Sequence, residues 1–401
     1  MFASDSLQSE MFGRHCARIL KARYCSTPWS SSGHCWVPRD ISAAICKMLL
    51  PHVLSCILFL CKVPLDPLLL VADEYAVLAD RLQRTIVAEL PKLAPNAELF
   101  FKMLVKERRF QPSVLLLMEK AMDVPTPTQA SRHCADVSPI RIFSGQQCIP
   151  EIAEMSNIYN FVRHNMLDDA DTRYQASFLN LFLGTKLSVL VGDFLLSKIL
   201  VILASTKNSE VQSILSKVVE HLVMGEAMEI TSSSEQLCSI AHYLEMVYYK
   251  KASLLANSCK AIAILAGKDE EITIMASNYG RYLGYAYHLM DDILDIAGIS
   301  ASSGNLSSDI ASRMFGAPML FAIEEFPELR RVVDCRFKNP SELEFGLECL
   351  RKSGGMQRTR ELATKYAGLA LEAIETFPRT NNNKDAEVSR QVLVELARKI
   401  I

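Results

Sequence analysis

The sequence has 401 residues, of which half are apolar, with 43 Lys and Arg against 45 Asp and Glu and a formal net charge of −2. A chain of this length and composition can bury a large core, and its near-neutral, interspersed charge excludes the strongly basic surface that binds nucleic acid. Its 12 cysteines show no C-x-x-C spacing, so they disfavour a zinc site or a disulfide-stapled secreted domain.

The first 65 residues differ in character from the rest, and we expect them to lie outside the fold. Basic residues between Arg14 and Arg39 surround a serine-rich stretch at Ser26–Ser32, which is typical of a transit peptide for a mitochondrion or plastid; the alternative location is the cytoplasm. The apolar run Met48–Cys61 contains Pro51 and is shorter than the ~18 residues that a spanning helix needs. We therefore predict a leader, or a segment foreign to the mature protein, in preference to a firm membrane anchor.

From residue 66 to residue 401, apolar residues recur at three- and four-residue spacing, which predicts one all-α domain. Helices are expected, in chain order, at Asp73–Leu90, from Ile149, at Ser177–Ala204, Val211–Ile230, Ala241–Ala266, Glu270–Ala297, Pro318–Phe326, Pro340–Lys352 and Met356–Phe377. Polar and Pro-rich segments predict loops at Pro125–Gly145, Ser300–Ser308 and Pro378–Asp385. Because Ser177–Ala204 is apolar nearly all round, we expect it in the middle of the bundle.

Three aspartates, Asp291, Asp292 and Asp295, interrupt the apolar helix predicted at Glu270–Ala297. Positions i and i+4 share a helix face, so Asp291 and Asp295 place two carboxylates about one turn apart. Magnesium prefers a few carboxylate oxygens together with waters and substrate phosphates. The alternative is a solvated acidic edge, which is disfavoured because Tyr282–Met290 is mostly apolar and aromatic. The motif thus predicts a magnesium site for a phosphorylated substrate.

A second acidic cluster, Asp168, Asp169 and Asp171, follows the helix predicted from Ile149. Two acidic helix ends that face each other across a bundle would hold several metal ions around one diphosphate. Taken alone, a cluster of this size indicates an ordinary helix-end surface. Its prediction as a metal site therefore depends on the Asp291 motif.

Several ordered segments resemble the trans-isoprenyl diphosphate synthases, and within them the solanesyl-type synthases of plants. They are Leu190–Leu196, His221–Ile230, Tyr248–Lys250, Leu289–Asp295 and Ala317–Phe321, within a match from about Leu65 to Ile401. The resemblance implies one large orthogonal helical bundle with a central cavity. It also implies a prenyltransferase that uses Mg²⁺ to ionise an allylic diphosphate, whose cation is then attacked by isopentenyl diphosphate. A homodimer, or a heterodimer with an intact synthase, is the assembly implied.

The same resemblance implies roles for individual residues. Metal ligands would be Asp291, Asp292 and Asp295 with Asp168 and Asp169, and the catalytic set would be Asp291, Asp292 and Lys250. Lys250 and Arg173 would bind the allylic diphosphate, while Arg108 and Arg109 would supply positive charge for isopentenyl diphosphate. Tyr159 lies where the family limits product growth; it predicts a short product, unless it is ordinary core packing.

The sequence departs from the family pattern mainly at the first aspartate motif and at the predicted pocket for isopentenyl diphosphate. His164 and Asn165 stand where the family has two aspartates, and their neutral side chains are poor magnesium ligands. Further changes alter the groups that would bind diphosphate. Glu107 stands where the family has glycine, Arg108 where it has lysine, and Gln111 and Tyr174 where it has arginine. Asn157 stands in place of histidine, Asn305 in place of lysine and Lys251 in place of threonine. Two readings stay open: a slow but working synthase, or a non-catalytic subunit that acts through its interface with an intact synthase.

Overall fold

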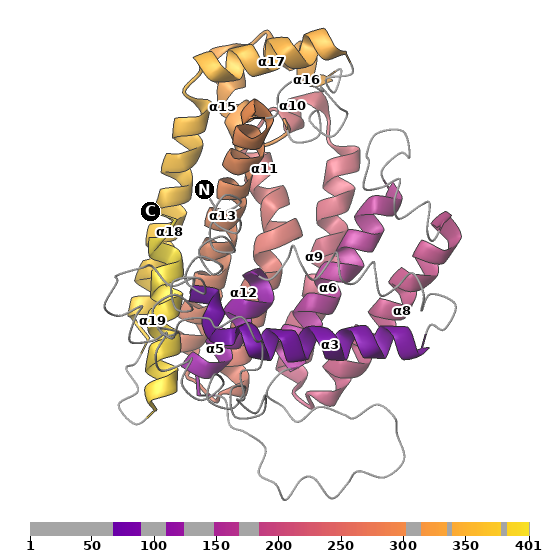
Figure 1. The fold of residues 1–401 in the computed structure, drawn as a ribbon, viewed down its shortest axis with the longest axis vertical. Helices are drawn as coiled ribbons and strands as arrows, with labels where there is room; N and C mark the ends of the chain where they lie inside the picture. The colour runs from indigo at the N-terminus through magenta and orange to yellow at the C-terminus, as the bar shows by residue number, and fades with distance from the viewer. Residues whose placement is uncertain are drawn as a thin grey trace, which may run out of the picture. The chain divides into compact units, whose positions relative to one another are not determined.

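In the computed structural model the residues described are 67–89, 110–123, 148–167, 184–301, 314–334, 339–377 and 383–400. All of them belong to one compact unit, Pro67–Ile401. Every regular element within these ranges is helical (Figure 1), which confirms the all-α prediction.

The elements in chain order are η1 Pro67–Val71, α3 Ala72–Glu89, α5 Phe110–Ala121, α6 Cys148–Leu167, α8 Gly184–Ser205, α9 Ser209–Thr231, α10 Ser234–Leu237, α11 Ile240–Val247, η3 Tyr248–Ala252, α12 Ser253–Leu265, α13 Glu270–Ala301, α15 Ala317–Glu325, α16 Leu329–Asp334, α17 Pro340–Lys352, α18 Gly355–Glu375 and α19 Lys384–Arg398. Of these, η1 is a 3₁₀ helix and η3 is a π-helix. The unit is organised around α13, a helix of 32 residues that packs along α12 and α18. In Figure 1, α3 runs across the direction of α9 and α13, which is the orthogonal arrangement that the resemblance implied.

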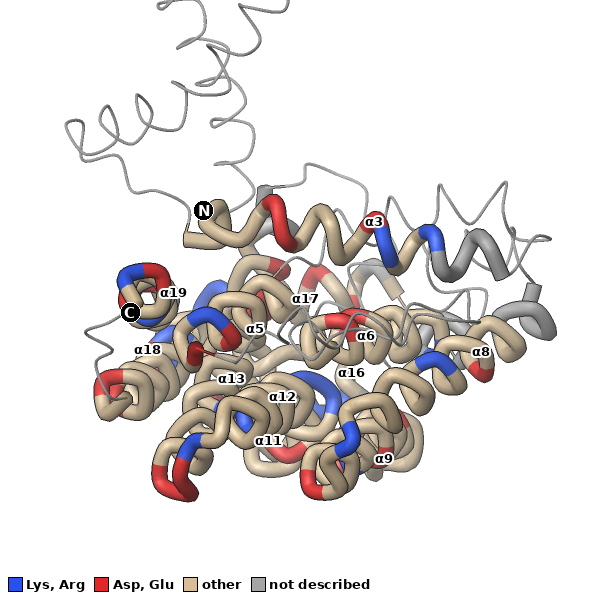
Figure 2. The backbone as a smooth tube through the Cα atoms, turned by 90° about the horizontal axis from the view of Figure 1, so that it is seen from below, with Lys and Arg blue, Asp and Glu red and all other residues tan. Residues whose placement is uncertain are grey.

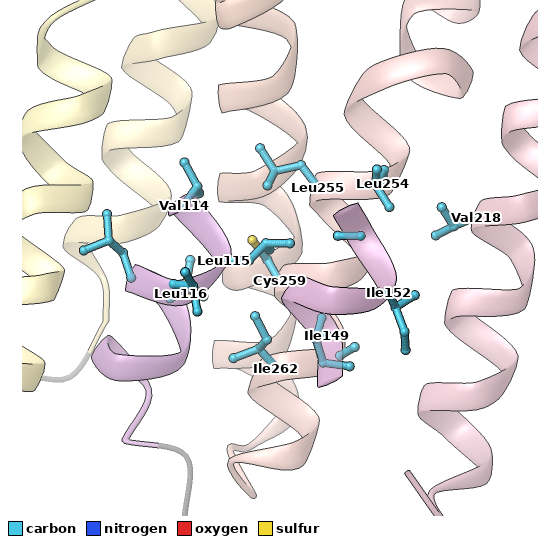
Figure 3. Close-up of a cluster of buried hydrophobic side chains, with 14 of the residues drawn as sticks. Val114, Leu115, Leu116, Ile149, Ile152, Val218, Leu254, Leu255, Cys259 and Ile262 are labelled. Atoms are coloured by element: carbon cyan, nitrogen blue, oxygen red, sulfur yellow. The ribbon is translucent and has the colours of Figure 1, made fainter. Parts of the chain in front are cut away.

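The main hydrophobic core lies where α5, α6, α9 and α12 meet (Figure 3). Leu115 of α5, Ile149 of α6 and Leu255 of α12 are fully buried there, and each such side chain contributes roughly 1.5–3 kcal/mol by leaving water. A second core joins α15, α16 and α17 to α13 and α18. Leu289 and Ile296 of α13 belong to this second core, so it fixes the helix on both sides of the aspartate motif.

Most predicted helix ends agree with the structure within a few residues, and α17 agrees at both ends. The prediction of one regular helix over Ala241–Ala266 is wrong in detail, because the π-helix η3 separates α11 from α12. A single π-turn barely disturbs apolar spacing, so periodicity does not reveal it. The helices α5 and α19 were not predicted. The loop predicted at Pro125–Gly145 lies outside the described residues.

The helix α8 lies at the edge of the unit, which corrects the prediction that this apolar segment is central. Val191, Leu195 and Ile199 are buried, but Leu190 is 61% exposed and Leu200 is 52% exposed. Figure 2 shows α8 at one side, with few charged residues along it. A helix that is apolar all round can be covered by another chain as well as by its own fold, and composition alone does not distinguish the two.

None of the helices within the described ranges is long and apolar enough to cross a membrane. The run Met48–Cys61 and the rest of the predicted leader lie outside those ranges.

Candidate metal and diphosphate site

The three aspartates of the predicted motif lie in the last three turns of α13, and the structure gives them different surroundings. Asp291 is half-buried, Asp292 is only 9% exposed and Asp295 is exposed. The spacing places Asp291 and Asp295 on one face of α13, while Asp292 points into the protein. The motif therefore divides into two accessible carboxylates and one that the fold encloses.

Asp291 is a carboxylate that its surroundings make costly to ionise. Burial raises its pKa to about 7, the negative charges of Asp295 and Asp292 act in the same direction, and only the positive charge of Lys251 opposes them. A divalent cation bound at this position would remove the repulsion between the carboxylates. The hard oxygen ligands of Asp291 and Asp295 thus fit magnesium, which leaves most of its coordination to water and phosphate.

Asp292 is held by groups from two other elements. Its Oδ2 accepts hydrogen bonds from the Tyr243 hydroxyl of α11 and from the Ala317 backbone N–H, 2.8 Å away, at the start of α15. Burial raises the pKa of Asp292 to about 6, although both hydrogen bonds favour the charged form and lower it. On the other side, His288 Nε2 lies 3.9 Å from Asp292 Oδ1.

His288 is a neutral neighbour of this carboxylate. Burial lowers its pKa to about 3, and the positive charges of Lys251 and Lys250 lower it further. At neutral pH the imidazole therefore offers Asp292 no positive charge. The ring instead packs against Tyr243 in a stacked arrangement, with 6.2 Å between the ring centroids.

Lys250 lies in the π-helix η3, a type of turn that often occurs at functional sites. Its ammonium contacts Glu226 Oε1 at 3.1 Å and also Glu229, both on α9. Burial alone would lower the pKa of Lys250, but the carboxylates of Glu229 and Glu226 outweigh it and raise the pKa. Lys250 therefore stays charged, and its contact with a diphosphate remains a prediction.

The segment around Glu226 contains a glycine for a steric reason. A Cβ atom on Gly225 would lie 3.1 Å from the backbone N of Lys250 and closer still to its side chain. The absence of a side chain lets α9 and η3 approach each other, so that the lysine reaches both glutamates.

Tyr159 of α6 is buried at 8% exposure. Its hydroxyl accepts a hydrogen bond from Arg163 Nη1 at 3.1 Å. Its ring faces Gly192 of α8, where a Cβ atom would lie 3.9 Å from Tyr159 Cε2. The ring is therefore fixed between α6 and α8, whatever its role in limiting product length.

Several residues with predicted roles lie outside the described residues: Arg108, Arg109, Asp168, Asp169, Asp171, Arg173, Tyr174 and Asn305. His164 and Asn165 lie within α6, but their side chains are not described. Gln111 is described, and its Oε1 is buried with no hydrogen-bond partner among the described residues. Within those ranges, no three or more His, Cys, Asp or Glu side chains are grouped so that they could hold a metal ion.

Sequence reasoning missed Tyr243, His288 and the two glutamates that hold Lys250. Tyr243 and Asp292 are separated by 49 positions, so no local pattern in the sequence connects them. Glu226 and Glu229 have the i, i+3 spacing of one helix face, which was the single local signal available.

Comparison with known proteins agrees with this fold. The profile of the polyprenyl synthetase family matches residues 104–349. The chain is 47% identical to solanesyl diphosphate synthase 3 of Arabidopsis thaliana, over 84% of this chain and 80% of that protein. It is 46% identical to solanesyl-diphosphate synthase 1 of Oryza sativa subsp. japonica, over 84% of this chain and 78% of that protein. The chain belongs to the polyprenyl synthetase family, which is a family of prenyltransferases.

Solved structures place the chain in the same class. The apo form of an Arabidopsis medium/long-chain length prenyl pyrophosphate synthase is similar with a TM-score of 0.66 and 43% identity, covering 84% of this chain and 98% of that chain. A decaprenyl diphosphate synthase from Rhodobacter capsulatus shares the fold with a TM-score of 0.67 at 22% identity, over 84% of this chain and 98% of that one. The all-α isoprenyl synthase fold implied by the sequence is thus confirmed.

Proposed function

We propose that this chain is a magnesium-dependent synthase that joins isopentenyl diphosphate to an allylic diphosphate and forms a polyprenyl diphosphate. The observation that carries the proposal is Asp291, a half-buried carboxylate crowded by Asp292 and Asp295 within a polyprenyl synthetase fold. Such crowding is costly in the metal-free protein and is relieved by a bound cation. The pairing of substrates follows from the family resemblance.

In the proposed reaction the allylic carbon–oxygen bond breaks, and its electron pair leaves with the diphosphate. The double bond of isopentenyl diphosphate attacks the resulting cation, and loss of a proton restores a double bond. Bound magnesium would supply positive charge to the departing diphosphate. Asp291 and Asp295 would hold it, together with Asp168 and Asp169.

The protein's own groups would supply the rest of the stabilisation. Lys250 is charged and partly desolvated, so it would act on a diphosphate more strongly than a fully hydrated lysine would. Arg173, Arg108 and Arg109 would contribute further positive charge. The apolar side chains around α12 and α13 would exclude water, which would otherwise capture the cation.

The proposed activity is reduced relative to an intact synthase. His164 and Asn165 remove two anionic ligands from the first motif, which weakens magnesium binding on that side. Gln111 offers a buried amide oxygen in place of the positive charge of an arginine, so a diphosphate would lose a charge-assisted hydrogen bond there.

A second candidate function is a non-catalytic subunit of a heteromeric synthase. The observation that favours it is the exposed apolar face of α8, which includes Val189, Leu190, Leu200 and Val201. Exposed apolar patches of this kind commonly mark protein interfaces. We propose that this face binds a second chain, either another copy or an intact synthase.

The predicted leader and the relatives support an organellar location. The Arabidopsis relative is described as chloroplastic/mitochondrial and the rice relative as mitochondrial. We propose that this chain also acts in a mitochondrion or plastid.

The direct test is to incubate the purified full chain with magnesium, labelled isopentenyl diphosphate and either geranyl or farnesyl diphosphate. Labelled product longer than the allylic substrate is expected, at a slow rate. No extended product at high protein concentration, combined with altered product length when an intact homologous synthase is added, would favour the subunit function instead.

A variant that restores the first aspartate motif would show which residues limit the rate. The double substitution His164→Asp and Asn165→Asp returns both anionic ligands, and a large gain in rate is expected if the remaining pocket is competent. An unchanged rate would place the main defect among Gln111, Asn157, Tyr174 and Asn305.

A further inference from the structure

Asp292 is the most buried of the three aspartates of the motif, and both of its oxygens face protein groups. Oδ2 accepts two hydrogen bonds, from the Tyr243 hydroxyl and the Ala317 backbone N–H. Oδ1 faces the His288 ring at 3.9 Å. A magnesium ligand must direct an oxygen lone pair to the metal, and the enclosure of Asp292 opposes such a role.

The backbone before α15 also covers this carboxylate. A Cβ atom placed on Gly316 would lie 2.8 Å from both Cγ and Oδ2 of Asp292. Only glycine leaves room for the chain to pass at this distance. The carboxylate thus joins three elements, namely α13, α11 through Tyr243 and the start of α15 through Ala317.

We propose that Asp292 is a positioning residue and not a metal ligand, and that Tyr243 acts through it to orient Asp291 toward the metal site. Successive residues of an α-helix point about 100° apart. A fixed Asp292 therefore fixes the rotation of α13 about its axis, and with it the direction of Asp291. The inference rests on the proposed function and deepens it, because it divides the motif into binding and positioning members.

The competing explanation is that Tyr243 contributes only to stability, as any buried tyrosine hydroxyl does. The molecule offers a matched comparison on the same helix. Tyr279 of α13 is also fully buried, and its hydroxyl donates to the Leu393 carbonyl oxygen at 2.9 Å. It lies 13 residues before Asp292 along α13, or roughly 20 Å at 1.5 Å per residue.

The first experiment compares Tyr243→Phe with Tyr279→Phe in the full chain. Magnesium binding in the presence of inorganic pyrophosphate is measured by calorimetry, alongside the melting temperature. Loss of the group that orients a metal ligand weakens metal binding about tenfold or more, and this is expected for Tyr243→Phe alone. Equal metal affinities in the two variants, whatever their melting temperatures, would overturn the proposal.

The second experiment separates the two adjacent aspartates. Asp291→Asn is expected to abolish the magnesium-dependent binding of pyrophosphate, whereas Asp292→Asn keeps an oxygen that can accept both hydrogen bonds and is expected to retain measurable binding. Retained binding in Asp291→Asn together with lost binding in Asp292→Asn would overturn the assignment. If the unaltered chain itself binds no magnesium in the presence of pyrophosphate, the proposed function fails at its metal site. That result is distinct from a loss of magnesium binding in only one of the two variants.

Discussion

Glu151 of α6 is a buried carboxylate outside the proposed site, and only 2% of the residue is exposed. Its Oε2 lies 3.9 Å from Arg81 Nη1 of α3 and has no hydrogen-bond partner among the described residues. Burial raises the pKa of Glu151 to about 7, and the charge of Arg81 opposes this rise only in part. A carboxyl group whose pKa is raised by folding favours the folded state most at low pH, where it is protonated.

Glu151→Gln tests this pH dependence. The stability associated with the protonated group is present below the unfolded pKa of about 4.5 and is lost as the pH rises through about 7. A neutral amide avoids that loss. The free energy of unfolding of the variant is therefore expected to be higher than that of the unaltered chain by roughly 1–3 kcal/mol at pH 8. The difference should shrink toward pH 5, as measured by urea unfolding. Glu348→Gln on α17, an exposed position, is the control, and a similar effect there would contradict the account.

Tyr159 allows a test of the predicted product length. Its ring is buried between α6 and α8 beside Gly192, and Arg163 binds its hydroxyl. If this ring closes the growing product's cavity, Tyr159→Ala is expected to lengthen the product, as chromatography of the labelled chains would show. An unchanged distribution of lengths would mean that Tyr159 is ordinary core packing.

At the scale of residues, the sequence could predict what depends on local spacing and on family motifs. Asp291 and Asp295 are one turn apart on a helix, and that relation is visible in the sequence. The enclosure of Asp292 is different, since Tyr243 comes from α11 and Ala317 from the start of α15. These contacts form only when three helices pack together, so no local pattern encodes them.

At the scale of elements, the contact between α12 and α13 depends on Gly280. A Cβ atom there would lie 2.6 Å from the Leu255 carbonyl oxygen and 2.9 Å from Ala256 Cα. Both are backbone atoms, which cannot move aside as the end of a long side chain can. The two helices therefore approach each other more closely than any side chain at this position would allow.

Gly280→Ala is expected to lower the free energy of unfolding by about 1–3 kcal/mol because the helices must separate. Gly368→Ala on α18 is the matched control, since a Cβ atom there meets nothing within 4 Å. Alanine is more favourable than glycine within a helix by about 1 kcal/mol, so Gly368→Ala is expected to raise the free energy of unfolding. Thermal unfolding of both variants measures the contrast, and stabilisation of both would contradict close packing at Gly280.

The exposed face of α8 predicts self-association or pairing with an intact synthase. Leu190→Glu places a charge at the most exposed large apolar residue of that face, which is 61% exposed, and is expected to shift the chain toward monomer in light scattering. Val388→Glu on α19, where valine is 44% exposed, is the control. Equal association of the two variants, alone and with an intact synthase, would exclude α8 as the interface.

The type and order of the long helices were predictable because apolar periodicity extends over many turns in α9, α13, α17 and α18. The edge position of α8 was not predictable, because its apolar residues are compatible with burial either by the same chain or by another chain. α19 begins within a segment predicted as a loop, since Asn383 caps it after a polar stretch and such stretches usually connect elements.

At the scale of the whole molecule, the fold is that of the polyprenyl synthetase family, while we propose that the departures from the family pattern lie mainly in one half of the substrate site. Folding depends on cores such as the one in Figure 3, whose labelled residues come from α5, α6, α9 and α12. A shared fold does not by itself establish catalysis, because function depends on the residues of the site.

The central claim is that the Asp291 side of this fold still binds magnesium for prenyl transfer. The most direct measurement is the rate of label transfer from isopentenyl diphosphate as a function of magnesium concentration, for the full chain and for Asp291→Asn. The account predicts a slow, saturable, magnesium-dependent rate that falls at least about a hundredfold in the variant, equivalent to roughly 2.7 kcal/mol of transition-state stabilisation. An Asp291→Asn chain that transfers label at the unaltered rate, with the same magnesium dependence, would contradict it.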